Sequence, residues 1–81
     1  MDYELIEEWL VGTIAFLSNT QPERIDVDKA FVDYALDSSL AVTLAEEIAK
    51  WVGQPLSATL FWEYPTIRLL AAALSAGEAS P

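Results

Sequence analysis

The sequence contains no cysteine and no histidine, and only four of its 81 residues are Lys or Arg. Without cysteine there is no disulfide bond and no thiolate metal site, and the cytoplasm is the simplest expected location. Without histidine, the most frequent general acid–base group and the commonest metal ligand are both missing. Neither a Ser-His-Asp nor a Cys-His catalytic set can be assembled. We therefore expect a chain that is not an autonomous enzyme.

Glycine and long apolar runs are also scarce. Only three glycines are present and they are scattered, so the chain has no glycine-rich phosphate loop. The longest uninterrupted apolar runs are far too short to span a bilayer. The N-terminus has neither the basic start nor the apolar run of a secretory signal. We expect a cytoplasmic protein with no membrane partner.

Negative charge dominates the polar residues. Thirteen Asp and Glu give a formal net charge of −9 and a pI near 4.1. Such a surface repels nucleic acid and anionic membranes and should attract basic partners. The acidic residues Asp26, Asp28 and Asp33 lack the glycine and the terminal bidentate glutamate of a calcium loop, so no metal site is predicted.

What the chain does have is enough apolar residues for one small core, because 53% of them are hydrophobic. Residues 3–18 are predicted to form a first helix that is capped by Asp2. Trp9 lies beside its apolar face. The residues of that face recur at spacings of four and three: Ile6, Leu10, Ile14 and Leu17.

Residues 19–37 are predicted to be an extended loop. Ile25 and Val27 should pin its middle to the core. A structureless loop of this length is uncommon and often functional. Its later part should be anchored by three further residues: Phe31, Tyr34 and Leu36.

Residues 38–52 are predicted to form the second helix. Asp37 is a good N-cap, Gly53 suits the position after the last turn, and Pro55 prevents continuation. The polar residues Glu46, Glu47 and Lys50 should face water. The predicted apolar stripe consists of Leu40, Leu44, Ile48 and Trp51 or Val52, with Ala41 and Ala45 allowing close packing.

The last third predicts one short helical turn at residues 57–62 and a final helix capped by Thr66 that ends near Gly77. The fold class is therefore all-α: a small four-helix bundle, three main helices and one short one, with a long loop between the first and second. We expect a monomeric domain over residues 1–76 and a flexible tail or linker over 77–81. The inner face of the last helix should be Ile67, Leu70, Ala71 and Leu74.

Ser38 is the most distinctive chemical group in the chain. It follows Asp37 at the predicted start of a helix, where the free N–H groups and the helix dipole favour a phosphodiester. Most Asp-Ser pairs only cap a helix, so the alternative is that Asp37 and Ser38 merely start one. Because the chain offers no base to activate this serine, any reaction at Ser38 must be carried out by a second enzyme.

Two stretches resemble a known family. Tyr34-Ala-Leu-Asp-Ser38 is similar to the attachment motif of acyl carrier proteins, which usually reads aromatic-Gly-Leu-Asp-Ser. Ser57-Ala-Thr-Leu-Phe-Trp-Glu-Tyr-Pro-Thr66 resembles the run that precedes the last helix in polyketide synthase carrier domains. The resemblance covers residues 3 to 76. It predicts an acyl carrier domain of the polyketide synthase type.

The resemblance implies a cofactor and a set of partners. Ser38, preceded by Leu36 and Asp37 of the motif, would carry 4′-phosphopantetheine that a phosphopantetheinyl transferase takes from coenzyme A. The cofactor's thiol would hold acyl intermediates as thioesters, so that a chain without cysteine imports its thiol. The tethered substrate would reach a ketosynthase, an acyltransferase or other synthase domains at high effective concentration.

By the family's pattern, the docking surface lies on the second helix and its approach. Glu46 and Glu47 would meet Arg or Lys on partners, although solvated helix positions are the alternative. Trp62 is a candidate for contact with the acyl chain, although aromatic residues in so small a bundle usually serve packing. The residues expected near the arm are Ser39, Val42 and Glu46.

Three residues depart from the family pattern. Ala35 replaces the usual glycine, Ser39 stands where an apolar residue usually follows the modified serine, and Thr43 stands where polyketide carriers often have Glu. Two rival interpretations stay open. One is a peptidyl carrier domain, which typically has Gly-Gly-His/Asp-Ser around its serine. The other is an unmodified acidic helical interaction module in which Ser38 is a plain cap.

Overall fold

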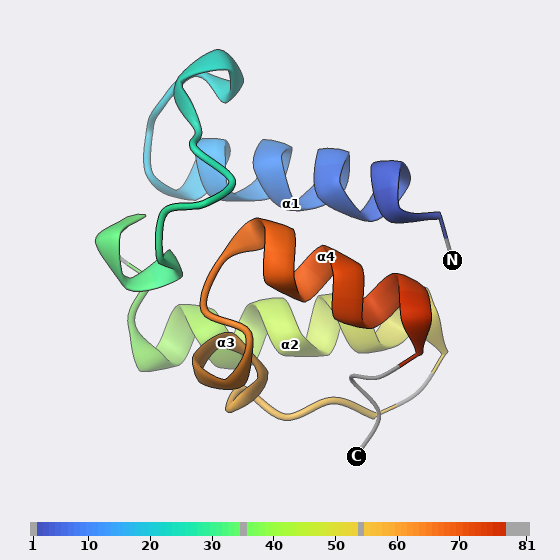
Figure 1. The fold of residues 1–81 in the computed structure, drawn as a ribbon. Helices are drawn as coiled ribbons and strands as arrows, with labels where there is room; N and C mark the ends of the chain where they lie inside the picture. Colours follow the sequence, from blue (N-terminus) through green and yellow to red (C-terminus); the bar gives the residue numbers. More distant parts are fainter. Residues whose placement is uncertain (1, 35, 54, 78–81) are drawn as a thin grey trace.

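The computed structural model describes residues 2–34, 36–53 and 55–77. These ranges contain four α-helices and two short 3-10 helices. Figure 1 shows α1 and α4 side by side, with α2 behind and below α4. The predicted all-α four-helix fold is confirmed. In chain order the elements are α1 (Tyr3–Leu17), η1 (Pro22–Arg24), η2 (Phe31–Tyr34), α2 (Ser38–Val52), α3 (Leu60–Glu63) and α4 (Ile67–Ala76).

The predicted helix starts are confirmed by their caps. The Asp2 carboxylate accepts the N–H of Glu4 at 3.0 Å, and the Thr66 hydroxyl accepts the N–H of Leu69 at 3.2 Å. Each bond satisfies a donor that has no partner within the helix. At the end of α2, Gly53 adopts the left-handed conformation with φ +77°, which other residues rarely accept.

The core lies where α1, α2 and α4 meet and is closed by residues of the loop and α3. The rings of Phe31 and Phe61 meet edge to face with centroids 5.1 Å apart, and both rings are buried. The predicted inner face of α4 is buried in full. The larger aliphatic core residues from the three long helices are Ile6, Leu10, Ile14, Leu44, Ile48, Ile67 and Leu70.

Three apolar positions differ from the prediction. Leu17 is 38% exposed because α1 ends there and the chain turns at Asn19, whose φ is +55°. At this end of α1, Ala15 is buried in place of Leu17. On α2 the buried stripe runs through Ala41, Leu44, Ala45 and Ile48. Leu40 is therefore only half-buried and Trp51 is exposed, since both lie on the flank of that stripe.

The connection between α1 and α2 is more ordered than predicted. The predicted long loop between the first two helices is confirmed, but it is not structureless, because it contains the short 3-10 helices η1 and η2. Its predicted anchors are confirmed: Ile25, Val27 and Tyr34 are half-buried against the core, while Phe31 and Leu36 are buried. Ala35, which replaces the glycine of the family pattern, lies outside the described residues.

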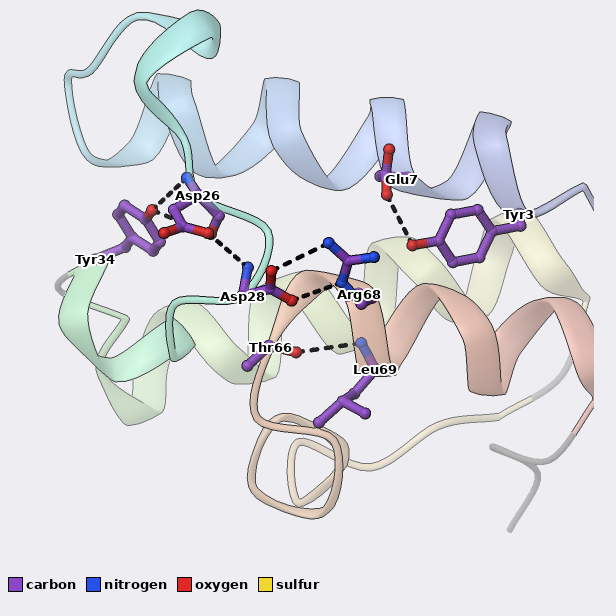
Figure 2. Close-up of polar contacts among 8 residues, drawn as sticks. All are labelled: Tyr3, Glu7, Asp26, Asp28, Tyr34, Thr66, Arg68 and Leu69. Atoms are coloured by element: carbon purple, nitrogen blue, oxygen red, sulfur yellow. Dashed lines mark hydrogen bonds and ion pairs between the residues drawn. The ribbon is translucent and has the colours of Figure 1, made fainter.

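A set of polar contacts fastens this loop to the start of α4 (Figure 2). Arg68 Nε donates to Asp28 Oδ1 at 2.6 Å and Arg68 Nη2 donates to Asp28 Oδ2 at 3.1 Å. The backbone N–H of Arg68 donates to the Val27 carbonyl at 3.0 Å, and that of Phe31 donates to the Pro65 carbonyl at 2.8 Å. We call these four bonds the loop clamp.

The short helix begins later than predicted. Residues 57–59 form a turn in which the Ser57 hydroxyl accepts the N–H of Thr59 at 3.3 Å, so α3 covers Leu60–Glu63 rather than residues 57–62. The final helix ends at Ala76, with Gly77 in the left-handed conformation at φ +75°. The rest of the predicted tail, residues 78–81, lies outside the described residues.

Candidate functional site: the start of α2

Ser38 is the first residue of α2 and is exposed. The Asp37 carboxylate accepts the N–H of Leu40 at 2.9 Å, and the Asp37 carbonyl accepts the N–H of Ala41 at 2.9 Å. The Ser38 hydroxyl makes no hydrogen bond to another described residue. The structure therefore presents a free hydroxyl at a defined helix start.

The position of Ser38 is set by packing on both sides of it. Leu36, two residues upstream, is buried in the core, and Ala41, three residues downstream, is fully buried. Further upstream the hydroxyl of Tyr34 accepts the N–H of Asp26 at 2.7 Å and donates to the Asp26 carbonyl at 3.2 Å (Figure 2). The exposed serine thus stands on an anchored segment.

The electrostatics at this point favour an anion. The first turn of an α-helix has N–H groups without intrahelical partners and carries the positive end of the helix dipole. The Asp37 side chain occupies only the N–H of Leu40, which leaves the amides of Ser38 and Ser39 outside that cap. A phosphate ester on the Ser38 oxygen is compatible with this environment. These residues fit a covalently attached phosphopantetheine.

The predicted docking residues divide into two groups. Ser39, Val42 and Glu46 are exposed and share one face of α2, since they are spaced by three and four residues; Val42 is 48% exposed. Glu47 lies on a different face and its Oε1 is 3.5 Å from Lys50 Nζ. Trp62 projects from α3 and is 51% exposed.

Thr43 takes part in a local hydrogen bond. Its hydroxyl donates to the Ser39 carbonyl at 3.1 Å, one turn earlier in the helix. A threonine that bonds back to the preceding turn is satisfied by its own helix. Thr43 thus replaces the acidic side chain often found in polyketide carriers with a group already engaged by its own helix.

Two hollows of about 320 and 340 Å³ lie at the end of α1, and Ser38 lines neither of them. Within the described residues there is no cluster of three Asp or Glu side chains suited to a metal ion. Nor does any helix of the described ranges have the length and apolar character needed to cross a membrane.

Sequence reasoning missed the contacts that hold the approach to Ser38. Asp28 and Arg68 are forty residues apart in the sequence, and Asp26 is eight residues from Tyr34. Neither pair has a spacing that a helix or strand period would predict.

Two hydrogen bonds shift the pKa of a titratable side chain. The hydrogen-bonded Arg68 guanidinium lowers the pKa of the Asp28 carboxyl. The Tyr3 hydroxyl donates to Glu7 at 2.8 Å, and this bond raises the pKa of Tyr3.

A four-helix bundle with an exposed serine at the start of its second long helix defines a carrier-type domain. The sequence model of the family described as "Phosphopantetheine attachment site" matches residues 8–74. The chain belongs to this family, whose domains carry covalently attached 4′-phosphopantetheine.

Polyketide synthases are among its relatives. The chain is 36% identical over 76 residues to a phenolphthiocerol/phthiocerol polyketide synthase of Mycobacterium tuberculosis, covering 94% of this chain and 4% of that protein. It is 40% identical over 68 residues to the pikromycin polyketide synthase component PikAII of Streptomyces venezuelae, covering 84% of this chain and 2% of that protein. The chain therefore matches a small segment of much longer synthases.

Solved carrier proteins share the fold. An acyl carrier protein from Anabaena sp. PCC 7120 with a variant phosphopantetheinylation-site sequence superposes with a TM-score of 0.87 at 35% identity, covering 95% of this chain and 88% of that one. A free-standing peptidyl carrier protein from Acinetobacter baumannii gives 0.86 at 32% identity, covering 94% and 95%. The chain is a carrier domain with phosphopantetheine attachment, and its relatives favour the polyketide type.

Proposed function

We propose that Ser38 is the residue that carries 4′-phosphopantetheine. Three observations support this: its exposure, its hydroxyl without a partner among the described residues, and its place at the N-terminus of α2. The Ser38 oxygen would attack the phosphorus that bears the pantetheine, forming an O–P bond while the P–O–P anhydride bond of coenzyme A breaks and the adenosine bisphosphate leaves. The hydroxyl proton would pass to a base of the transferase, because this chain contains no histidine.

The domain then acts as a non-catalytic carrier. The bound group supplies a thiol that holds acyl or polyketide intermediates as thioesters. Leu36 and Asp37 hold the attachment point, so the tether's origin is fixed relative to the domain. Tethering raises the effective concentration of the intermediate at each partner enzyme. The carrier domain spans residues 1–76 and acts as a monomer in the cytoplasm, and residues 77–81 serve as a tail or linker.

The partners are a phosphopantetheinyl transferase and synthase domains such as a ketosynthase or an acyltransferase. Ser39, Val42 and Glu46 supply a partly apolar, partly acidic face beside Ser38, which suits transient contact with basic surfaces. Glu47, on another face of α2, and Trp62, on α3, are the remaining candidates for partner contact. Glu47 contributes less, since Lys50 already lies near it.

The peptidyl carrier alternative is favoured by one observation, the TM-score of 0.86 with a peptidyl carrier protein. The residues before Ser38 argue against it, because Leu36 and Asp37 match the acyl carrier motif rather than Gly-Gly-His/Asp-Ser. The unmodified interaction module would need an exposed Ser38 that serves only to start a helix. It predicts that no cofactor is attached.

The test is the intact mass of the protein after incubation with coenzyme A and a broad-specificity phosphopantetheinyl transferase. Wild type and Ser39→Ala should each gain one phosphopantetheine, and Ser38→Ala should gain none. Ser39→Ala is the matched control because Ser39 is the neighbouring exposed serine in the same helical turn. A mass gain in Ser38→Ala, or none in folded wild type, overturns the assignment.

A further inference from the structure

Helix α1 carries a second apolar stripe that the core does not use. Residues at positions 5, 9, 12 and 16 lie on one flank of an α-helix, because their spacings are four, three and four. Here they are Leu5, Trp9, Gly12 and Phe16. Leu5 is 56% exposed and Phe16 is 78% exposed, whereas Ile6 and Leu10 of the core face are fully buried.

Helix α2 extends this stripe. The rings of Trp9 and Trp51 are 5.6 Å apart between centroids with an interplanar angle of 34°, and Trp51 is 38% exposed. A Cβ atom added at Gly12 would meet nothing within 4 Å, so the stripe is open between its bulky side chains. We define the aromatic face as the five residues Leu5, Trp9, Gly12, Phe16 and Trp51.

The aromatic face is separate from the surface beside Ser38. Ser38 occupies the first turn of α2 and Trp51 the last, roughly 20 Å apart along the helix axis at ~1.5 Å per residue. Trp51 also projects from the side of α2 opposite Val42, since nine residues amount to two and a half turns. Contacts at one surface therefore leave the other free.

Charge around the aromatic face indicates what covers it. Glu4 and Glu8 lie next to it on α1, and both are exposed. Glu47 lies one turn before Trp51 on α2, and the nearby cation, Lys50, is 3.5 Å from it. A second copy of the chain would bring an equally acidic rim and a further net charge of −9. Nucleic acid and anionic membranes are repelled for the same reason.

We propose that the aromatic face is a docking surface for an amphipathic protein helix whose apolar side is flanked by Lys or Arg. Exposed apolar residues that cluster on one face commonly mark interaction sites. Apolar side chains of the partner would cover Leu5 and Phe16, and the open space at Gly12 would accept a bulky one. The acidic rim would select the partner's cations. This surface is independent of the attachment of phosphopantetheine to Ser38.

The test uses a synthetic helical peptide of Leu and Lys, with Leu repeated every three and four residues. The ¹⁵N-labelled chain contains three indole N–H groups, which single Trp→Phe variants assign. The signals of Trp9 and Trp51 should shift on titration while that of Trp62 stays. A scrambled peptide of the same composition and a Leu/Glu helix should cause no shift. Ser38→Ala should respond as wild type does.

Substitutions distinguish specific binding at the aromatic face from nonspecific hydrophobic binding elsewhere on the surface. Leu5→Ser and Phe16→Ser should each weaken peptide binding by about tenfold, because each removes an apolar side chain that binding would cover. Leu69→Ser is the matched control, since Leu69 is 49% exposed on α4 and outside the aromatic face. Unchanged binding in Phe16→Ser, a shift confined to Trp62, or no shift overturns the proposal. Concentration-dependent shifts without peptide would overturn it too, by identifying a second copy as the occupant.

Discussion

At the scale of single residues, Asp37 decides where Ser38 stands. Its carboxylate accepts the N–H of Leu40 and its carbonyl accepts the N–H of Ala41, so α2 starts at Ser38. A capping side chain of this kind typically stabilises a helix by ~1 kcal/mol. The same bond leaves the serine hydroxyl outside the cap. One residue thereby links helix stability to the presentation of Ser38, the proposed attachment point.

Replacing Asp37 by Ala should lower the free energy of unfolding by ~1 kcal/mol and slow the loading of Ser38 with phosphopantetheine. The reason is the loss of the bond to Leu40 N–H, which loosens the first turn of α2. Urea unfolding gives the stability, and the time course of mass gain gives the loading rate. Asp37→Asn is the control, since Asn caps about as well as Asp. Equal stability of the Ala and Asn variants would contradict the role assigned to the cap.

At the scale of elements, the loop before α2 is held against the later helices by specific contacts. The loop clamp ties Val27, Asp28 and Phe31 to the start of α4, and Phe31 meets Phe61 of α3. Figure 2 shows the Arg68 guanidinium directed at the Asp28 carboxylate. The approach to Ser38 is consequently joined to both later helices.

Breaking the side-chain part of the loop clamp should expose its backbone part to solvent. In Arg68→Gln, hydrogen exchange at the amide of residue 68 and at Phe31 should accelerate several-fold, because the bidentate pair no longer holds the loop on α4. Exchange at Ile48, in the middle of α2, should stay unchanged and serves as the internal control. Unaltered exchange at residue 68 would show that the ion pair does not hold the loop.

The same clamp should respond to pH in one direction. The pKa of Asp28 is lowered in the folded state by its hydrogen bond with Arg68. The stabilisation that the Asp28–Arg68 pair provides is therefore present above the ordinary aspartate pKa. It is lost as the pH falls through the lowered pKa of Asp28. After correction for the pH dependence of intrinsic amide exchange, the protection of the amide of residue 68 should fall over that acidic range in wild type. The Arg68→Gln variant should lack this dependence.

At the scale of the whole molecule, the net charge of −9 should favour encounter with basic partners. Attraction between exposed charges weakens as ionic strength rises. Of the two candidate glutamates on α2, Glu46 shares the face of Ser39 and Val42, while Glu47 lies near Lys50. We therefore expect the two side chains to contribute unequally to the attraction of a basic partner.

Loading of Ser38 by the transferase should slow as salt is added, and Glu46→Lys should raise the KM for the carrier more than Glu47→Lys does. Each variant changes the net charge equally, so the pair separates local contact from overall attraction. The measurement is the initial rate of mass gain against carrier concentration at low and high salt. Equal effects of the two substitutions would remove Glu46 from the docking surface and leave the assignment of Ser38 untouched.

Local signals in the sequence were sufficient for much of this protein. The bounds of α2, the caps Asp2, Asp37 and Thr66, and the left-handed Gly53 all follow from short-range hydrogen bonding and backbone preference, which neighbouring residues determine. The same local pattern predicted that Ser38 is the first residue of α2, next to the N-cap Asp37. Such features need no knowledge of which helix packs on which.

Only the tertiary structure decided the features that depend on distant residues. Leu17 and Trp51 fit an apolar period, yet each is 38% exposed. Leu17 lies at the end of α1, and Trp51 is covered on one side by the Trp9 ring. The loop forms 3-10 turns because α4 and Phe61 hold it through contacts such as the one between Asp28 and Arg68. Periodicity orients a residue on its own helix, whereas burial is set by what lies opposite, and that is a property of the folded chain.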